Sequence, residues 1–205
     1  MGSKQSIKTW PTIWCLIFFC VLTWSGLSPK DRFTWFLEVA PALLGFVLLS
    51  LTFVRFRLTK LVYFLILIHS IILMVGGHYT YSEVPLFNWV KESLSFSRNH
   101  YDRVGHFAQG FVPAMIAREI LIRKSPLKPG KWLFFIVTCI CLAISATYEL
   151  LEWLVAINTG EAADAFLGSQ GDPWDTQTDM AFALLGAIVA QTLLSKIHDK
   201  QIKGL

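Results

Sequence analysis

The chain has 205 residues, of which 54% are hydrophobic and only 16% are charged, with a formal net charge of +4. Soluble domains carry about 25% charged residues, and the mean hydropathy of +0.53 is high. These values exclude an ordinary soluble domain and favour a multi-pass membrane protein. Membrane lipid is the expected partner, nucleic acid is not, and the composition assigns no protein partner.

Six apolar stretches follow one another along the chain, each about long enough to cross a bilayer as a helix. They cover roughly 10–28, 33–54, 61–81, 102–122, 132–155 and 176–195. Lys4 and Lys8 precede the first stretch as in a secretion signal, but no A-x-A-like cleavage site follows, so we interpret it as a retained helix. The prediction is an all-α polytopic membrane helical bundle with six transmembrane helices, forming one integral domain over residues 1–205.

Lys and Arg are distributed unevenly between the two sides of these stretches. If the N-terminus is cytoplasmic, 13 of the 18 Lys and Arg residues lie on the cytoplasmic side and 5 lie outside. Because short cytoplasmic segments are enriched in positive residues, we expect both termini to be cytoplasmic. The connections at about 82–101 and 156–175 then lie on the outer side.

Ionisable residues recur near the outer ends of several stretches. Three pairs are spaced to share one helix face, namely Asp102 with His106, Glu149 with Glu152, and Asp175 with Asp179. Such groups in a membrane usually face the bundle interior or a wet cavity, and they mark function. We therefore expect a single pocket that opens toward the non-cytoplasmic side.

Carboxylates and imidazoles that share one pocket suit two kinds of chemistry. They suit general acid–base catalysis, for which the six paired residues are the candidates, and they suit a divalent metal. The candidate metal ligands are His78, His100, His106, Glu149, Glu152, Asp172, Asp175 and Asp179. The sequence lacks the H-E-x-x-H, G-x-S-x-G and P-loop patterns, so it does not decide whether the protein is an enzyme.

Simpler roles compete for several of these residues. Asp102 and Asp175 lie where an anion favours a helix N-terminus, so helix capping would explain both. Glu149 and Glu152 would be salt-bridged if Arg98 or Arg103 reached them, and His78 would serve as an anchor at the membrane surface.

Other polar residues are interpreted as structural. Glu38 has no partner by spacing, and a lone His69 in mid-helix is expected to bond to a neighbouring helix. Arg118 and Glu119 are expected to reach the inner membrane surface, and His198 to lie in the cytoplasmic tail. The cysteines Cys15, Cys20, Cys139 and Cys141 lie in apolar runs, which predicts neither a disulfide nor a zinc site.

Several outer-side motifs carry a resemblance to a known family. The segments HYTYSEVPLFNW, RNHYDRVGHFAQGFVPAMIARE, ATYELLEW and FLGSQGDPWDTQTDMAFALLGA resemble the YjdF family of bacterial multi-pass inner-membrane proteins. This resemblance is clearest from His78 to Ala190. It implies location in the bacterial inner membrane and carries no activity with it.

A weaker resemblance is to VanZ-like membrane proteins, some of which are linked to glycopeptide-antibiotic resistance. Asp102, His106 and Phe107 fit their D-K-x-x-H-F pattern, with Arg103 in the place of Lys. Glu149 and Asp175 fit the two later pieces, but Glu152 replaces a Gln and Asp179 replaces an Asn. The site is therefore more anionic than the VanZ pattern, which favours a metal or proton role.

Three functions remain open at this point. The protein is a metal-dependent enzyme acting on a lipid or envelope precursor, or it binds or transports a cation, proton or polar envelope molecule. The third alternative is a structural accessory protein whose polar groups tie its helices together. No pair of repeated halves with broken helices supports an ordinary secondary transporter.

Overall fold

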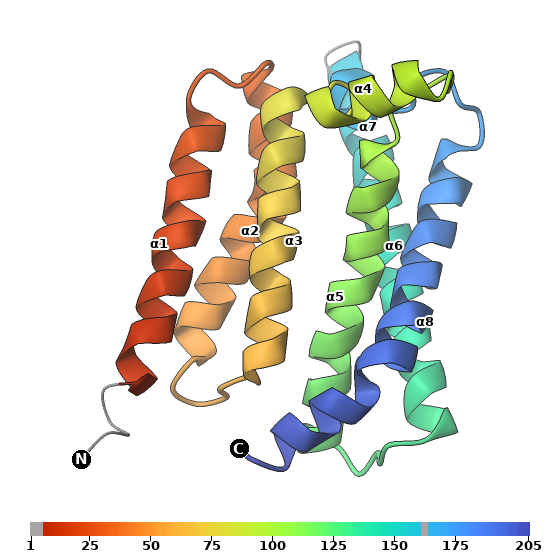
Figure 1. Ribbon diagram of the computed structural model, residues 1–205. Coiled ribbons are helices and arrows are strands. Elements are labelled where there is room, and N and C mark those ends of the chain that lie inside the picture. The colour runs from red at the N-terminus through yellow and green to blue at the C-terminus, as the bar shows by residue number, and fades with distance from the viewer. Residues whose placement is uncertain (1–5, 161–163) are drawn as a thin grey trace.

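Six long helices stand side by side in the computed structural model, which describes residues 6–160 and 164–205 (Figure 1). The long helices are α1 (Ser6–Gly26), α2 (Arg32–Thr52), α3 (Lys60–Tyr79), α5 (Tyr101–Lys124), α6 (Lys131–Thr159) and α8 (Asp175–Ile202). A short helix, α4 (Pro85–Ser93), lies across the end of the bundle opposite the two chain termini, and α7 (Asp164–Leu167) lies near the end of α6. The all-helical fold class is confirmed for the described residues.

The helix bounds differ from the expected spans at the start of α1, which begins at Ser6 instead of 10, and at the ends of the last two long helices. α6 continues four residues past the expected end at 155, and α8 continues from the expected end at 195 to Ile202. Side chains cap the N-termini of α2 and α3. The Asp31 carboxylate accepts a hydrogen bond from the Thr34 N–H at 2.6 Å, and the Thr59 hydroxyl accepts one from the Val62 N–H at 3.4 Å.

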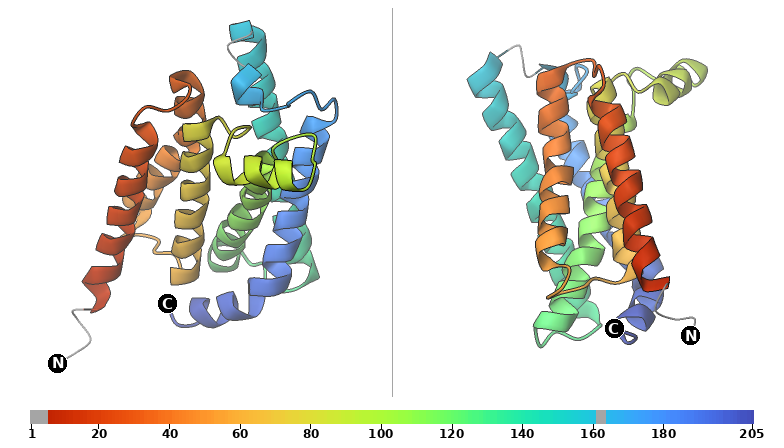
Figure 2. Two further views of the ribbon diagram at one scale, coloured as in Figure 1. Left: turned by 45° about the horizontal axis from the view of Figure 1, so that its top comes forward. Right: turned by 90° about the vertical axis from the view of Figure 1, so that its left-hand side faces the viewer.

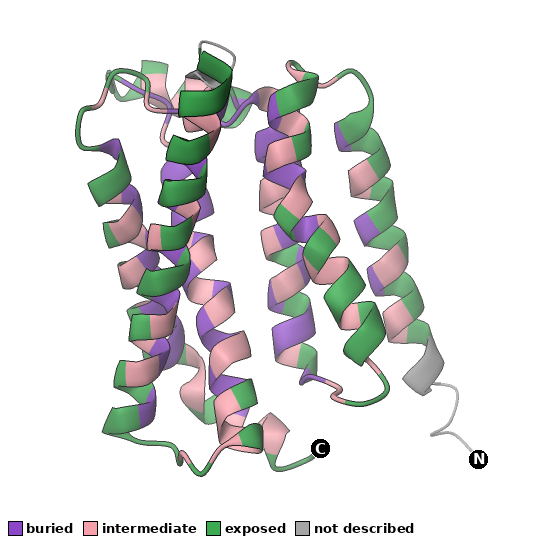
Figure 3. Cartoon of the chain, turned by 180° about the vertical axis from the view of Figure 1, so that it is seen from behind, coloured by how far each residue is buried: buried purple, intermediate pink, exposed green. Residues whose placement is uncertain are grey.

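Five of the long helices are long and apolar enough to cross a membrane, and these are α1, α2, α3, α6 and α8. Exposed apolar side chains such as Leu48, Phe135 and Leu193 occur along them, as expected for surfaces that face lipid. Figure 3 shows exposed residues on the outward sides of the helices and buried residues toward the centre.

α5 has the length of a membrane span but not the apolar composition. It packs against α3, α6 and α8, so it lies inside the bundle. Its ionisable residues Asp102, Arg103, Arg118 and Glu119 are all buried. They are therefore turned toward other helices, as ionisable groups at membrane depth normally are.

The closest helix pair is α5 with α8. A Cβ atom added to Gly110 would collide with the backbone carbonyl of Ala183, and one added to Gly186 would collide with the backbone carbonyl of Phe107. Small residues let membrane helices approach this closely. This approach brings the starts of α5 and α8 together, and it sets the geometry of the polar site.

Candidate functional site

Two buried arginines tie the start of α5 to the start of α8. The side chains of Arg98 and Arg103 are only 7% and 5% exposed. Arg103 Nη2 donates to Asp175 Oδ1 at 2.6 Å and to Asp172 Oδ2 at 3.0 Å, and Nη1 donates to Asp179. Arg98 Nη1 donates to the same oxygens of Asp175 and Asp172 at 2.6 Å and 3.2 Å. Asp172 and Asp175 are therefore committed to ion pairs.

This pairing differs from the one expected from the sequence. Arg98 and Arg103 were candidate partners for Glu149 and Glu152 on α6, but their guanidinium groups contact the carboxylates of α8 and the loop before it. The reason is the close glycine-mediated contact between α5 and α8. Asp175 does lie in the first turn of α8, where an anion is favoured, but its carboxylate also pairs with both arginines.

Asp172 lies outside the membrane-spanning helices, where its carboxylate also accepts from the Trp174 N–H at 2.9 Å. This hydrogen bond, together with the charges of Arg103 and Arg98, holds the pKa of Asp172 below its ordinary value of 3.8. The carboxylate is thus charged at neutral pH and remains an acceptor for both arginines.

His106 is the centre of a second group of contacts, one turn deeper. Its Nε2 atom lies 3.4 Å from Asp102 Oδ1 and 3.7 Å from Asp179 Oδ1, and its Nδ1 lies 3.7 Å from Glu149 Oε1. One ligand atom each from Asp102, His106 and Asp179 lie within 4.8 Å of one another. Three helices therefore deliver carboxylates to one imidazole, and three of these residues have the spacing of a metal site.

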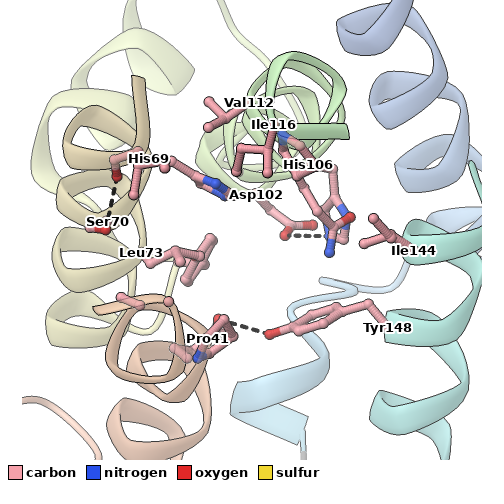
Figure 4. Close-up of a pocket in the computed structure, with 18 of the residues that line it drawn as sticks. Pro41, His69, Ser70, Leu73, Asp102, His106, Val112, Ile116, Ile144 and Tyr148 are labelled. Carbon is pink, nitrogen blue, oxygen red and sulfur yellow. Dashed lines mark hydrogen bonds and ion pairs between the residues drawn. The ribbon is translucent and has the colours of Figure 1, made fainter. Parts of the chain in front are cut away.

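A cavity of about 260 Å³ lies directly beside His106 (Figure 4). Glu38, Asp102, His106 and Glu152 supply its ionisable lining together with His69. In Figure 4, the side chains of Asp102, His106, His69 and Tyr148 are grouped around one space. Of the six paired candidates, Asp102, His106 and Glu152 line this cavity, whereas Glu149, Asp175 and Asp179 do not.

The structure does not bring His78 and His100 into this group. His78 Nδ1 lies 2.9 Å from the carbonyl oxygen of Ser25, and its ring stacks on Trp24 at 4.7 Å. His100 lies edge-on to Phe96, and burial, with Arg98 and Arg103, lowers its pKa.

The cavity also contains residues that the sequence analysis set aside. Glu38, which had no partner by spacing, accepts from the Tyr148 hydroxyl at 3.5 Å. His69 was expected to bond to a neighbouring helix, but its Nε2 is buried without a hydrogen-bond partner among the described residues. The sequence did carry a signal for both residues, namely a polar side chain inside an apolar span. This signal is a better guide to a functional site than the presence or absence of a partner at helical spacing.

A separate buried polar cluster lies at the opposite end of the bundle. Glu119 accepts from the Thr59 N–H and hydroxyl, from Arg123 at 2.7 Å, and from His198 Nε2 at 3.0 Å. Arg118 donates to His198 Nδ1 at 3.0 Å, and because arginine is only a donor, His198 must be the neutral Nε2–H tautomer. The interpretations of Glu119 as reaching the membrane surface and of His198 as a tail residue were therefore wrong, since both are fully buried.

We expect Glu119→Gln to lower the free energy of unfolding by about 3–5 kcal/mol, because it leaves Arg123 and the Thr59 donors without a carboxylate. Unfolding of the purified protein along a series of mixed detergents, from native to denaturing, measures this free energy. Asp199→Asn is the matched control, since Asp199 pairs with Arg118 at the more exposed edge of the same cluster. Equal stability of the two variants would contradict the central role of Glu119.

Comparisons with known proteins agree with this membrane architecture. The model of a family described as "Predicted membrane protein (DUF2238)" matches residues 10–200. The chain is 50% identical over 183 residues to the inner membrane protein YjdF of Escherichia coli (strain K12), covering 89% of this chain and 88% of that protein. No solved structure matches the chain. The resemblance to YjdF proteins is thereby confirmed, and the chain belongs to the DUF2238 family of membrane proteins.

Proposed function

We propose that the protein crosses the bacterial inner membrane six times, with α5 as the sixth span and both termini in the cytoplasm. The bias of Lys and Arg supports this orientation. The start of α1 and the end of α8 also lie at the same end of the bundle (Figure 1). The cavity beside His106 then lies near the non-cytoplasmic face.

We further propose that this site holds a divalent cation and acts on a lipid or envelope precursor. The observation that carries the proposal is the placement of His106 Nε2 between the carboxylates of Asp102 and Asp179. When Nδ1–H donates to Gln109 Oε1, at 3.3 Å, the Nε2 lone pair of the neutral ring faces two anions. A cation at this point, either a metal or a proton on Nε2, resolves the repulsion.

The residues have distinct roles in this scheme. Asp102, His106 and Asp179 are the ligands, and the metal would polarise an ester or phosphate of the substrate. Glu152 lines the cavity and is the candidate general base. Glu149 Oε1 is buried without a hydrogen-bond partner among the described residues, so it is available to an incoming ligand or proton.

Metal analysis of the purified protein tests this proposal. After mild chelation and reloading with Zn²⁺ or Mn²⁺, the wild type should hold one ion per chain. His106→Gln and Asp102→Asn should bind it at least about tenfold more weakly, since each removes or weakens a ligand. Asp172→Asn, which alters an arginine-paired carboxylate outside the ligand set, should retain the ion. A wild type that binds neither metal would refute the metal site.

One observation favours non-enzymatic proton or cation binding as a second candidate. Arg103 already donates to Asp179, and its positive charge disfavours a divalent ion at the same carboxylate. In that case His106 carries the positive charge itself as an imidazolium. Nitrogen NMR of His106 in metal-free protein distinguishes a doubly protonated ring from a neutral one.

A further inference from the structure

The cavity beside His106 continues from the polar outer end of the bundle into its apolar middle. Glu38, Asp102 and Glu152 lie at the outer end, and Gly45, Ile116 and Ile144 line the deeper part. With a rise of 1.5 Å per residue, the deeper residues lie about 10 to 20 Å further into the bundle along their helices. The cavity lining is therefore polar toward the outer end and apolar further in. This order matches a lipid in the outer half of a bilayer, whose head points outward and whose chain points inward.

One side of this cavity is open between α2 and α6. These two helices are not among the closely packed helix pairs of the described chain, since α2 packs on α3 and α6 packs on α5 and α8. Figure 2 shows the two helices diverging toward the outer end in its right-hand view. The hydrogen bond between Tyr148 and Glu38 is the one side-chain bridge recorded between them in the described residues.

The residues at this opening are both exposed and part of the cavity wall. Pro41 on α2 and Ile144 on α6 line the cavity, and Ile144 is 41% exposed. A shallow apolar groove on α6 shares Ile144 and Tyr148 with the cavity. A Cβ atom added to Gly45 would meet no other atom within 4 Å, so this wall borders open space. The opening faces the hydrocarbon region because it lies between two membrane-crossing helices.

A second polar position lies within the cavity. The Nε2 atom of His69 is buried without a hydrogen-bond partner among the described residues, and Gln109 lines the same space. An unpaired buried polar atom is costly unless a ligand or water satisfies it. An ester carbonyl or hydroxyl just below a polar head would meet this requirement, whereas a pure hydrocarbon would not.

We infer that the cavity takes up a membrane lipid sideways, through the opening between α2 and α6, from the outer half of the bilayer. The polar head lies against Asp102 and His106, and the start of one acyl chain lies along Gly45, Ile116 and Ile144. The volume of about 260 Å³ is just below the roughly 300–1,000 Å³ of typical ligand pockets, so the rest of the lipid stays in the bilayer. The role of the head-binding residues and the choice of the outer half of the bilayer rest on the proposed function and topology, whereas sideways loading between α2 and α6 does not.

Photo-crosslinking with a lipid probe tests this inference. The protein is reconstituted into vesicles of phosphatidylethanolamine and phosphatidylglycerol containing a phosphatidylethanolamine with a diazirine in its acyl chain. After illumination, mass spectrometry locates the labelled residues. We expect labelling of Val112 and Ile116, which line the cavity on the central helix α5. Gly45→Trp and Ile144→Trp, each of which fills the opening from one side, should abolish this labelling.

Leu48→Trp is the matched control, because Leu48 is on the same helix as Gly45, is 53% exposed and does not line the cavity. In this variant the lipid probe should label Val112 and Ile116 to the same extent as in the wild type. Labelling confined to exposed positions such as Leu48 and Leu151, or unchanged in both tryptophan variants at the opening, would overturn the inference. Since the probe needs no metal, interior labelling of a protein that binds no metal would refute only the proposed metal chemistry.

Discussion

Arg103→Met is expected to lower the free energy of unfolding by about 3–5 kcal/mol, because it leaves the buried carboxylate of Asp179 without its arginine partner. Asp179 is almost fully buried, so water cannot replace the guanidinium. Unfolding in a detergent–denaturant titration, followed by far-UV circular dichroism, measures the change.

Two further variants separate the ion pair from general damage to the bundle. In the double variant Arg103→Met with Asp179→Leu, no unpaired charge remains at this position, so part of the lost stability should return. Lys30→Met removes an ion pair with Glu83 in which both side chains are 48% exposed, and it should cost less than about 1 kcal/mol. An Arg103→Met protein as stable as Lys30→Met would show that α5 and α8 do not depend on this tie.

Gly110→Leu is expected to prevent the native packing of α5 on α8. The new side chain would have to occupy the position of the Ala183 backbone, which cannot move away without separating the two helices. The free energy of unfolding should fall by more than about 4 kcal/mol, which is the range seen for severe steric or cavity defects. The protein should elute as aggregated material in size-exclusion chromatography, or unfold at far lower denaturant.

Gly45→Leu provides the control for this substitution. It places the same side chain in a membrane helix, but at a position where an added Cβ meets no atom within 4 Å. We expect Gly45→Leu to remain monodisperse with nearly native stability. If Gly110→Leu behaved in the same way, the close contact of α5 and α8 would not exist in the folded protein.

The acids near the starts of α5 and α8 and the end of α6 fall into two groups with different physical roles. Asp172 and Asp175 are bound by Arg98 and Arg103, which is a tie between helices. Glu149 and Glu152 lie around His106 and the cavity, and neither pairs with an arginine in the part of the chain that the structure describes. Asp102 and Asp179 belong to both groups, because each contacts Arg103 and His106. The chemistry proposed for the site therefore rests on the second group.

The sequence by itself determined the class of the protein and the depth of its polar residues. Apolar stretches of membrane length predict helices, and the position of Asp102, Glu149 or Asp175 within its stretch gives its distance from the membrane surface. Local periodicity also placed Asp102 and His106 on one face, as observed. The family follows from contiguous motifs, which need no tertiary information.

Only the tertiary structure decided which residues face one another. The rotation of each helix depends on which neighbour approaches closely, and for α5 and α8 this is set by Gly110 and Gly186, 76 positions apart. That contact places Arg103 against Asp179. The packing of α2 on α3, and of α3 on α5, brings Glu38 and His69 to the cavity. The orientation of His78 toward Ser25 was likewise fixed by the packing of α3 against α1. Spacing along one helix carries no information about such contacts, because they depend on residues distant in the chain.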